Sequence, residues 1–210
     1  MIIAVDGPTA SGKGTIAVAL AKRFGLPHLD TGLLYRAVGR QVFLDGGDVD
    51  DSGDALAACA FPDTMLADSA LRDEATGAMA SRVSVHPAVR QALFDRQRAF
   101  ATQAGGAVLD GRDIGTVIAP DARVKLFVTA SVEARAERRY REMHERGTDV
   151  TREAIAKDIA RRDARDMNRA DAPLKPAADA YILDTTAFGK EQAVETAIEL
   201  VENALDSGTN

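Results

Sequence analysis

The sequence predicts an α/β fold in which helices cover both faces of a parallel sheet. Two observations support this prediction: five short apolar segments alternate with amphipathic helical patterns, and a glycine-rich turn joins the first segment to the first helix. The chain has 210 residues, of which 46% are hydrophobic, and this is enough for one core with a small satellite region. We therefore expect a single folded unit.

The first predicted strand, Ile2–Val5, is a run of apolar residues. The helix after the glycine-rich turn places Ile16, Leu20 and Phe24 on one stripe, and Gly25 stands where a left-handed residue commonly ends a helix. Four more apolar segments are expected to be strands: Leu26–Leu29, Ala107–Leu109, Val124–Val128 and Tyr181–Leu183. Short apolar strands separated by helices are typical of a parallel sheet that is buried on both faces.

The connection between the second and third strands, residues 30–106, is far longer than a crossover requires. Its first part, residues 45–68, is rich in Gly and Asp and contains no Lys or Arg, which predicts a loop with short helices. Residues 86–101 have the pattern of an amphipathic helix. Further helices are expected after Ser131, after Thr151 and from Glu191 to the end of the chain.

Composition limits the partners and the compartment. The formal net charge of −6 argues against a general surface for nucleic acid or anionic membranes, which favour a basic face. Cys59 is the single cysteine, so a disulfide framework is excluded and a reducing compartment is favoured. The apolar start is too short for a signal peptide, and no segment is long enough to span a bilayer. We expect a cytoplasmic monomer that binds neither nucleic acid nor membranes.

The stretch DGPTASGKGT, residues 6–15, places Gly7, Gly12 and Lys13 in the spacing G-x-x-x-x-G-K, between a predicted strand and a predicted helix. Glycines let successive N–H groups point inward, and the helix start adds partial positive charge, so such a loop is typical of a phosphate site. The strict pattern has Ser or Thr directly after the lysine, whereas here Gly14 intervenes and Thr15 is the nearest hydroxyl. A turn without a ligand is the alternative, and the strand–loop–helix context favours phosphate.

Two further stretches, LDTGLLYR and LDGRDIG, each follow a predicted strand and carry an arginine, Arg36 and Arg112. Ligands of open α/β sheets bind at the carboxyl ends of the strands, so both arginines should converge on the same crevice as Lys13. The planar guanidinium binds phosphate through two hydrogen bonds, which predicts a second anion there. A solvated surface charge is the alternative for Arg36.

Arginines also recur on two predicted helices at three- and four-residue spacings, which place them on one face. They are Arg135, Arg138 and Arg139 on the first helix, and Arg162 and Arg169, with Asp166, on the second. In an acidic chain with a phosphate loop, such helices indicate a lid that closes on a polyphosphate. Ion pairs within each helix are the plain alternative, and an RNA-binding helix is disfavoured because only Tyr140 lies among these arginines.

Together these stretches resemble the bacterial cytidylate kinases, in order and across almost the whole chain. The matching stretches are DGPTASGKGT, LDTGLLYRAVG, SRVSVHPAVRQALFDRQRAFA, LDGRDIGTVIAPDARVKLFVTAS and RRDARDMNRADAPLKPAADAYILDTT. Many kinases share the first stretch, whereas GRDIGTV followed by RDARDMNRADAPL is much more specific. The resemblance implies a P-loop nucleoside monophosphate kinase fold that transfers the γ-phosphoryl group of ATP to CMP or dCMP with Mg²⁺, and it accounts for Gly14, because these kinases read G-K-G-[ST].

The resemblance also implies roles for individual residues. The residues that it implies around ATP are Gly7, Pro8, Thr9, Ala10, Ser11, Gly12, Lys13, Gly14 and Thr15. Those near the acceptor phosphate are Arg36, Arg112 and Arg162; those around cytosine are Thr31, Arg90, Asp113 and Arg169; and those at the ribose are Ser81, Asp166 and Arg162. The residues expected to catalyse transfer by positioning and charge stabilisation are then Lys13, Arg36, Arg112, Arg138 and Arg162. Thr15 and Asp110 are expected to hold the magnesium ion.

The family's organisation implies a core of residues 1–35, 86–130 and 170–210, a substrate-binding insert over 36–85, and an arginine-rich lid with its following helix over 131–169. Thr31 replaces the serine that is frequent in the family, which adds a methyl group near the base. Residues 60–81 are too short and too poor in β-formers for the family's small antiparallel sheet, so a reduced insert is expected. His28, His86 and His144 are scattered and are assigned no chemistry.

Three alternatives remain open from the residues themselves. A P-loop kinase of another nucleoside monophosphate or small acceptor would keep Lys13 and the lid without the cytosine set. A GTP switch predicts a guanine-reading N-K-x-D stretch, which the sequence lacks. A nucleotide sensor without turnover is disfavoured by the complete set of arginines.

Overall fold

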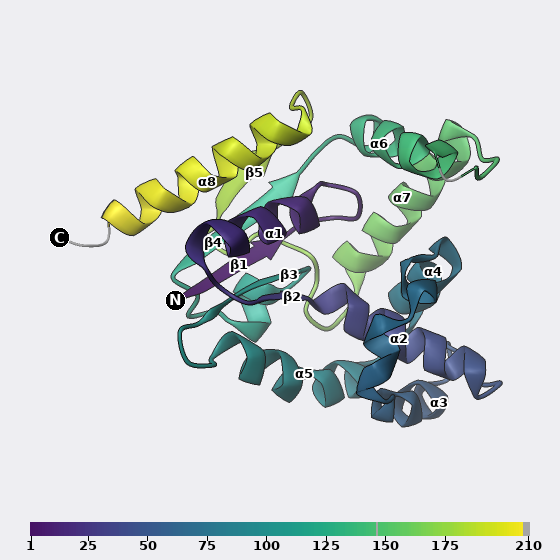
Figure 1. Cartoon of the computed structure of the whole chain (residues 1–210). Coiled ribbons are helices and arrows are strands. Elements are labelled where there is room, and N and C mark those ends of the chain that lie inside the picture. Colours follow the sequence, from purple (N-terminus) through teal and green to yellow (C-terminus); the bar gives the residue numbers. More distant parts are fainter. Residues whose placement is uncertain (146, 208–210) are drawn as a thin grey trace.

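Figure 1 shows a computed structural model of the protein, which describes residues 1–145 and 147–207. Arg146 and the last three residues, which fall in the predicted lid and core ranges, lie outside the described residues. Five parallel strands form one sheet in the order β2-β3-β1-β4-β5. They are β1 Ile2–Asp6, β2 His28–Asp30, β3 Ala107–Gly111, β4 Val124–Thr129 and β5 Tyr181–Asp184. The predicted α/β class and all five predicted strands are confirmed.

The second strand differs in its bounds from the prediction, Leu26–Leu29. Ladder pairing begins only at His28. The Leu26 N–H donates to the Ala21 carbonyl at the end of the preceding helix, and Pro27 has no N–H to donate. The chain therefore leaves the helix over these two residues before it enters the sheet.

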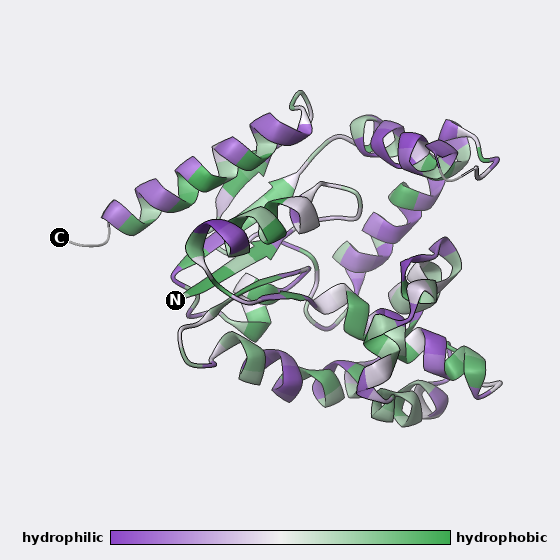
Figure 2. Ribbon diagram, viewed as in Figure 1, coloured by the Kyte–Doolittle hydropathy of each residue, from purple (hydrophilic) through white to green (hydrophobic). Residues whose placement is uncertain are grey.

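Helices cover both faces of the sheet, as predicted. Helices α1, Lys13–Phe24, and α8, Lys190–Ser207, pack on one face through Ile16, Leu20 and Val201. Helix α5, Pro87–Ala101, and the π-helical turn η4, Ile114–Ile118, pack on the other. The three inner strands of the sheet, β1, β3 and β4, are correspondingly mostly apolar (Figure 2).

The long connection between β2 and β3 is helical throughout residues 31–106, apart from its turns, and these residues form no strand. It contains the helices α2 Thr31–Leu44, α3 Ser52–Ala57, α4 Glu74–Val83 and α5, and the short 3₁₀ turns η1 Ala58–Ala60, η2 Asp63–Ala67 and η3 Ser69–Arg72. A separate apolar cluster, which includes Leu34, Leu71 and Val83, holds these helices together. The expectation of short helices in residues 45–68 is confirmed, whereas the reduced insert stays a prediction.

Two helices follow β4, and both are mostly hydrophilic in Figure 2. They are α6, Val132–Glu145, and α7, Arg152–Asn168. A small apolar contact of Ala136, Ile155 and Ile159 joins them. Across residues 1–145 and 147–207, none of the helices combines the length and the apolarity that a membrane crossing requires.

Candidate active site

The predicted phosphate loop lies between β1 and α1, at the carboxyl end of the sheet. Gly7 has φ 154°, and a Cβ there would lie 2.1 Å from the Val128 carbonyl oxygen, so the close approach to β4 requires glycine. Lys13 opens α1, and its Nζ donates to the Pro8 carbonyl oxygen at 3.3 Å. Burial first, and then the Arg112 charge, lower the pKa of Lys13 to about 8. The strand–loop–helix context predicted for this stretch is confirmed.

A cleft of about 650 Å³ opens beside this loop, a size suited to a nucleotide. Its walls include Thr9, Ala10, Ser11, Gly12, Thr15, Arg36, Arg138, Arg139 and Arg162, together with Thr185, Phe188 and Lys190. Arg138 is held at the rim because its guanidinium donates to Thr185 Oγ1 at 3.0 Å and to the Ser11 carbonyl at 3.4 Å. Four predicted loop residues, Gly7, Pro8, Lys13 and Gly14, do not line this cleft or the cavity next to it.

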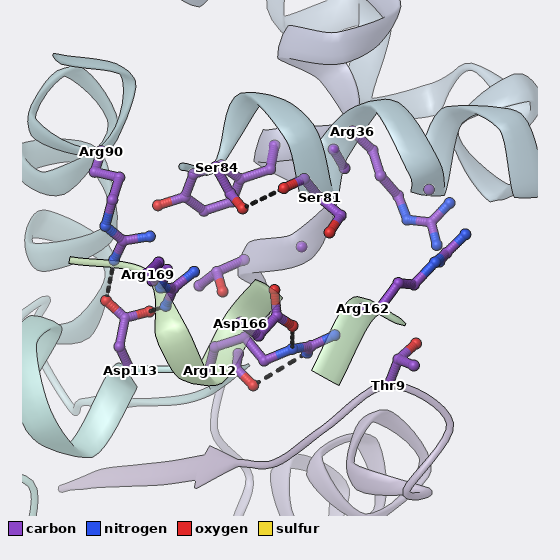
Figure 3. A pocket seen from close by; sticks show the side chains of 16 residues that line it. Thr9, Arg36, Ser81, Ser84, Arg90, Arg112, Asp113, Arg162, Asp166 and Arg169 are labelled. Atoms are coloured by element: carbon purple, nitrogen blue, oxygen red, sulfur yellow. Dashed lines mark hydrogen bonds and ion pairs between the residues drawn. The ribbon is translucent and has the colours of Figure 1, made fainter. Parts of the chain in front are cut away.

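A second cavity lies next to the cleft, and Figure 3 shows the side chains that line it. Its lining includes all nine residues predicted for the acceptor nucleotide: Thr31, Arg36, Ser81, Arg90, Arg112, Asp113, Arg162, Asp166 and Arg169. These residues come from α2, α4, α5, the loop after β3, and the end of α7. The fold therefore gathers into one cavity the residues that the sequence supplies from distant segments.

Seven other residues line this cavity. Thr9 was predicted only for the ATP site, and sequence reasoning missed the remaining six: Gly32, Tyr35, Gly77, Ala80, Ser84 and Gly111. Most are small and contribute backbone or shape, so no motif signals them. Tyr35 is the exception: it is buried, and the Arg90 guanidinium lies over its ring, 5.8 Å from the ring centre. Its place one residue before Arg36 in a marked stretch was the only available signal.

One end of the cavity is built around a buried aspartate. Asp113 forms an ion pair with Arg90, and Arg169 Nη2 lies 3.7 Å from Asp113 Oδ1 (Figure 3). Burial raises the pKa of Asp113, against the opposing effect of both arginines. Such an end of a cavity offers both a carboxylate acceptor and guanidinium donors to a ligand.

Asp6, which sequence reasoning did not single out, fixes the loop that carries Asp113. The backbone N–H groups of Ile114 and Gly115 both donate to the Asp6 carboxylate at 2.8 Å. Burial outweighs these two hydrogen bonds and raises the pKa of Asp6 to about 7. The last residue of β1 thus ties the phosphate loop to the loop after β3.

The opposite end of the cavity gathers arginines. Arg36 and Arg162 lie there in Figure 3, near Thr9 of the phosphate loop, and both also line the neighbouring cleft. Arg36 donates to the carbonyl oxygens of Leu71 (2.8 Å) and Asp73 (3.0 Å). The two cavities therefore meet at a cationic junction.

Arg112 and Asp166 face each other between the two ends, and Arg112 Nε donates to Asp166 Oδ2 at 2.9 Å. Arg112 also lies close enough to Lys13 for its charge to lower the pKa of that lysine. Arg36 and Arg112 line one cavity together with Thr9 of the phosphate loop, whereas Lys13 lines neither this cavity nor the cleft, so their convergence on the crevice of Lys13 stays a prediction.

Two carboxylates lie side by side at the strand ends, because Asp30 of β2 pairs with Asp110 of β3. A Cβ on Gly14 would lie 3.9 Å from Asp110 Oδ1, so this carboxylate faces the start of α1. Its other oxygen, Oδ2, lies 2.8 Å from His28 Nε2. His28, to which sequence reasoning assigned no chemistry, therefore orients Asp110.

These oxygen donors match the preference of Mg²⁺, and Thr15 lies in the first turn of α1. Across the described residues, no group of three or more His, Cys, Asp or Glu side chains is arranged to hold a metal ion by itself. A cation here would need further oxygen ligands from bound phosphates or water.

Comparisons with known proteins agree with this geometry. Residues 3–203 match the family model described as cytidylate kinase. Cytidylate kinase from Methylocella silvestris is 54% identical over 208 residues, which cover 99% of this chain and 96% of the relative. That from Xanthobacter autotrophicus is 55% identical over 202 residues, covering 96% and 97%.

A solved structure, that of an uncharacterised protein from Eubacterium ventriosum, has a similar fold, with a TM-score of 0.55 and 15% identity over 96% of this chain and 98% of that chain. The family model that matches residues 3–203 and the near-complete coverage and high identity of the relatives show that the chain belongs to the cytidylate kinase family.

Proposed function

We propose that the chain transfers the γ-phosphoryl group of ATP to CMP or dCMP, with the acceptor in the cavity around Asp113 and ATP in the cleft beside the phosphate loop. One observation carries this assignment of the two sites. All nine residues predicted for the acceptor line one cavity, which meets the cleft at Arg36 and Arg162. Two nucleotides bound in this way would point their phosphates at each other.

Phosphoryl transfer leaves little covalent chemistry to the protein, so positioning and charge stabilisation carry catalysis. Lys13 and the N–H groups of the loop hold the β- and γ-phosphates of ATP. Arg36, Arg112 and Arg162 hold the acceptor phosphate, and Arg138 acts from the ATP side. The acceptor phosphate oxygen is the nucleophile, and this chain contributes no covalent intermediate.

Magnesium fits the oxygen donors of this site. When bound, Mg²⁺ neutralises part of the negative charge on the phosphates. Thr15 would contribute a hydroxyl oxygen, and Asp110 would hold the ion's water shell. His28 keeps the Asp110 carboxylate oriented through its contact with Oδ2, which leaves Oδ1 toward the loop.

The base is read at the buried end of the cavity. The exocyclic amino group of cytosine donates a hydrogen bond, whereas uracil has a carbonyl oxygen at the same position. A carboxylate that faces this edge attracts cytosine and repels uracil, so Asp113 is the main discriminating group. Arg90, Arg169 and Thr31 complete the base site, and Ser81 and Asp166 contact the ribose.

The proposal includes the organisation inferred from the sequence. Residues 36–85 act as the substrate-binding insert, residues 131–169 as the lid, and the rest as the core. We propose a monomer that works in the cytoplasm; the free thiol of Cys59 supports a reducing compartment.

A coupled assay of ADP release tests the activity. ATP is offered with CMP, dCMP, UMP, AMP, GMP and dTMP, and with shikimate as a small acceptor of another class. We expect turnover with CMP and dCMP to exceed turnover with every other acceptor. A preference for a purine nucleotide or shikimate would contradict the proposal, and a folded chain that binds ATP without turnover would favour a sensor.

A further inference from the structure

Glu74, the first residue of α4, forms ion pairs with two helices that both lie far from it in the sequence. Its carboxylate forms one ion pair with Arg139 of α6 and a second with Arg162 of α7. The Glu74 side chain is 38% exposed, whereas that of Arg162 is only 9% exposed. A single surface carboxylate therefore holds two arginines, one of them buried, across the boundary between the proposed insert and the proposed lid.

The place of this contact is the junction of the two nucleotide sites. Arg162 lines both the cavity and the cleft, and Arg139 lines the cleft. Glu74 itself lines a third pocket, which shares Thr9 and Arg162 with both sites and otherwise lies mostly against α6 and α7. The two arginines that Glu74 holds thus line the region toward which the proposed function directs the transferred phosphoryl group.

The charges around Glu74 favour its ionised form. Desolvation by itself would raise its pKa, but Arg139, Arg162 and Arg36 together lower it below the usual value. Arg139 and Arg162 each also have a partner within their own helix: Glu142 lies 2.9 Å from Arg139, and Asp158 lies 2.7 Å from Arg162. Glu74 differs from these partners because it comes from another part of the fold.

We propose that Glu74 is a positioning residue: an internal counter-ion that holds Arg139 and Arg162 in the nucleotide-free enzyme and yields them to the phosphoryl group when nucleotides bind. This inference rests on the proposed function, which places phosphates between these arginines. A carboxylate and a phosphate compete for the same guanidinium fork, and the two anions repel each other when water is excluded. Nucleotide binding therefore has to displace Glu74, which weakens the affinity for phosphates.

A purely structural role predicts the opposite sign. If Glu74 only braced the lid in its binding position, its removal would disorganise the arginines and weaken nucleotide binding. The direction in which nucleotide affinity changes on removal of Glu74 thus separates a counter-ion that competes with the substrate from a residue that only stabilises the lid.

The test compares Glu74→Gln with the matched control Glu137→Gln. Glu137 also bridges two arginines, Arg141 at 2.7 Å and Arg152 at 3.1 Å, but both belong to the lid helices, and its side chain is 30% exposed. Calorimetry measures the dissociation constants of ATP, CMP and cytidine for each variant. We expect E74Q to bind ATP and CMP about tenfold more tightly than wild type, cytidine to bind equally, and E137Q to match wild type.

Amide hydrogen exchange gives a second readout. In E74Q without nucleotide, α6 and α7 should exchange faster than in wild type, and with ATP and CMP bound the difference should disappear. Glu74→Asp keeps the charge but is one methylene shorter, so its affinities should lie between those of wild type and E74Q, and this keeps the test decisive if the amide variant does not fold.

Unchanged or weaker binding of ATP and CMP by folded E74Q would overturn the inference. Equal tightening in E137Q would also overturn it, because net charge alone would then explain the effect. Turnover of CMP by the wild-type enzyme is read separately, so a failure of the proposed function is distinguishable from a failure of the role of Glu74.

Discussion

Replacing Asp113 with asparagine should change base preference more than any other single substitution. Asp113 is only 4% exposed and lies between the guanidinium groups of Arg90 and Arg169. Asparagine is nearly isosteric and keeps an oxygen acceptor for Arg90, but its amide group can also donate a hydrogen bond. Uracil, which presents a carbonyl oxygen at this position, should then be tolerated, whereas cytosine loses a charged acceptor.

The expected size of the effect follows from burial. A mismatched polar group in a water-poor site costs about 1–3 kcal/mol, which corresponds to about 5- to 150-fold in a ratio of rates. We therefore expect the ratio of kcat/KM for CMP to that for UMP to fall at least about tenfold in Asp113→Asn.

The assay measures kcat/KM for CMP and UMP in wild type, Asp113→Asn and the control Asp171→Asn. Asp171 also pairs with Arg90, at 3.3 Å, but its side chain is 52% exposed, so its replacement should leave the ratio within about twofold. Thermal unfolding shows whether the Asp113 variant folds, since it removes a charge from a buried pair. A folded Asp113→Asn with the wild-type ratio would refute the reasoning that Asp113 reads the base.

Lys13→Met should lower turnover by at least about a hundredfold without loss of the fold, and wild-type turnover in a folded variant would exclude Lys13 from the site. In titrations, the ATP affinity of the wild type should fall as the pH rises through about 8, because Lys13 then loses its proton. The ATP affinity of the variant should not change over this pH range. Arg36→Gln should raise KM for CMP more than for ATP in initial-rate measurements. Equal weakening of both substrates would place Arg36 elsewhere. Asp110→Asn should lower kcat with every acceptor and raise the magnesium concentration for half-maximal rate, while an altered ratio of CMP to UMP would contradict this role.

Much of the fold was predictable because its signals are local. The run Ile2–Val5, the glycine spacing and the stripe that includes Ile16 and Leu20 all act within a few residues, and the structure has the expected strand, loop and helix there. The short helices of residues 45–68 were also predictable, because this stretch is rich in Gly and Asp and contains no Lys or Arg. The start of β2 was not, since the helix end at Ala21 competes for the Leu26 N–H.

The candidate site was predictable where residues stand in a marked stretch, and not where one residue acts on another from far away. Asp6 accepts hydrogen bonds from residues more than a hundred positions later in the chain. His28 of β2 contacts Asp110 of the neighbouring strand β3, 82 residues later in the chain. Glu74 finds its arginines 65 and 88 residues further on. No spacing encodes such pairs, because the sheet order and the packing of α4 against the lid create them.

A crystal structure of the chain with CMP and a non-hydrolysable ATP analogue tests the central claim most directly, namely that the two cavities hold the two nucleotides with their phosphates at the arginine junction. The account predicts the cytosine amino group within hydrogen-bond distance of the Asp113 carboxylate, and the CMP phosphate among Arg36, Arg112 and Arg162. It also predicts the analogue's phosphates against Lys13 and the loop N–H groups. CMP bound with its base away from Asp113, or with its phosphate away from these arginines, would contradict the account.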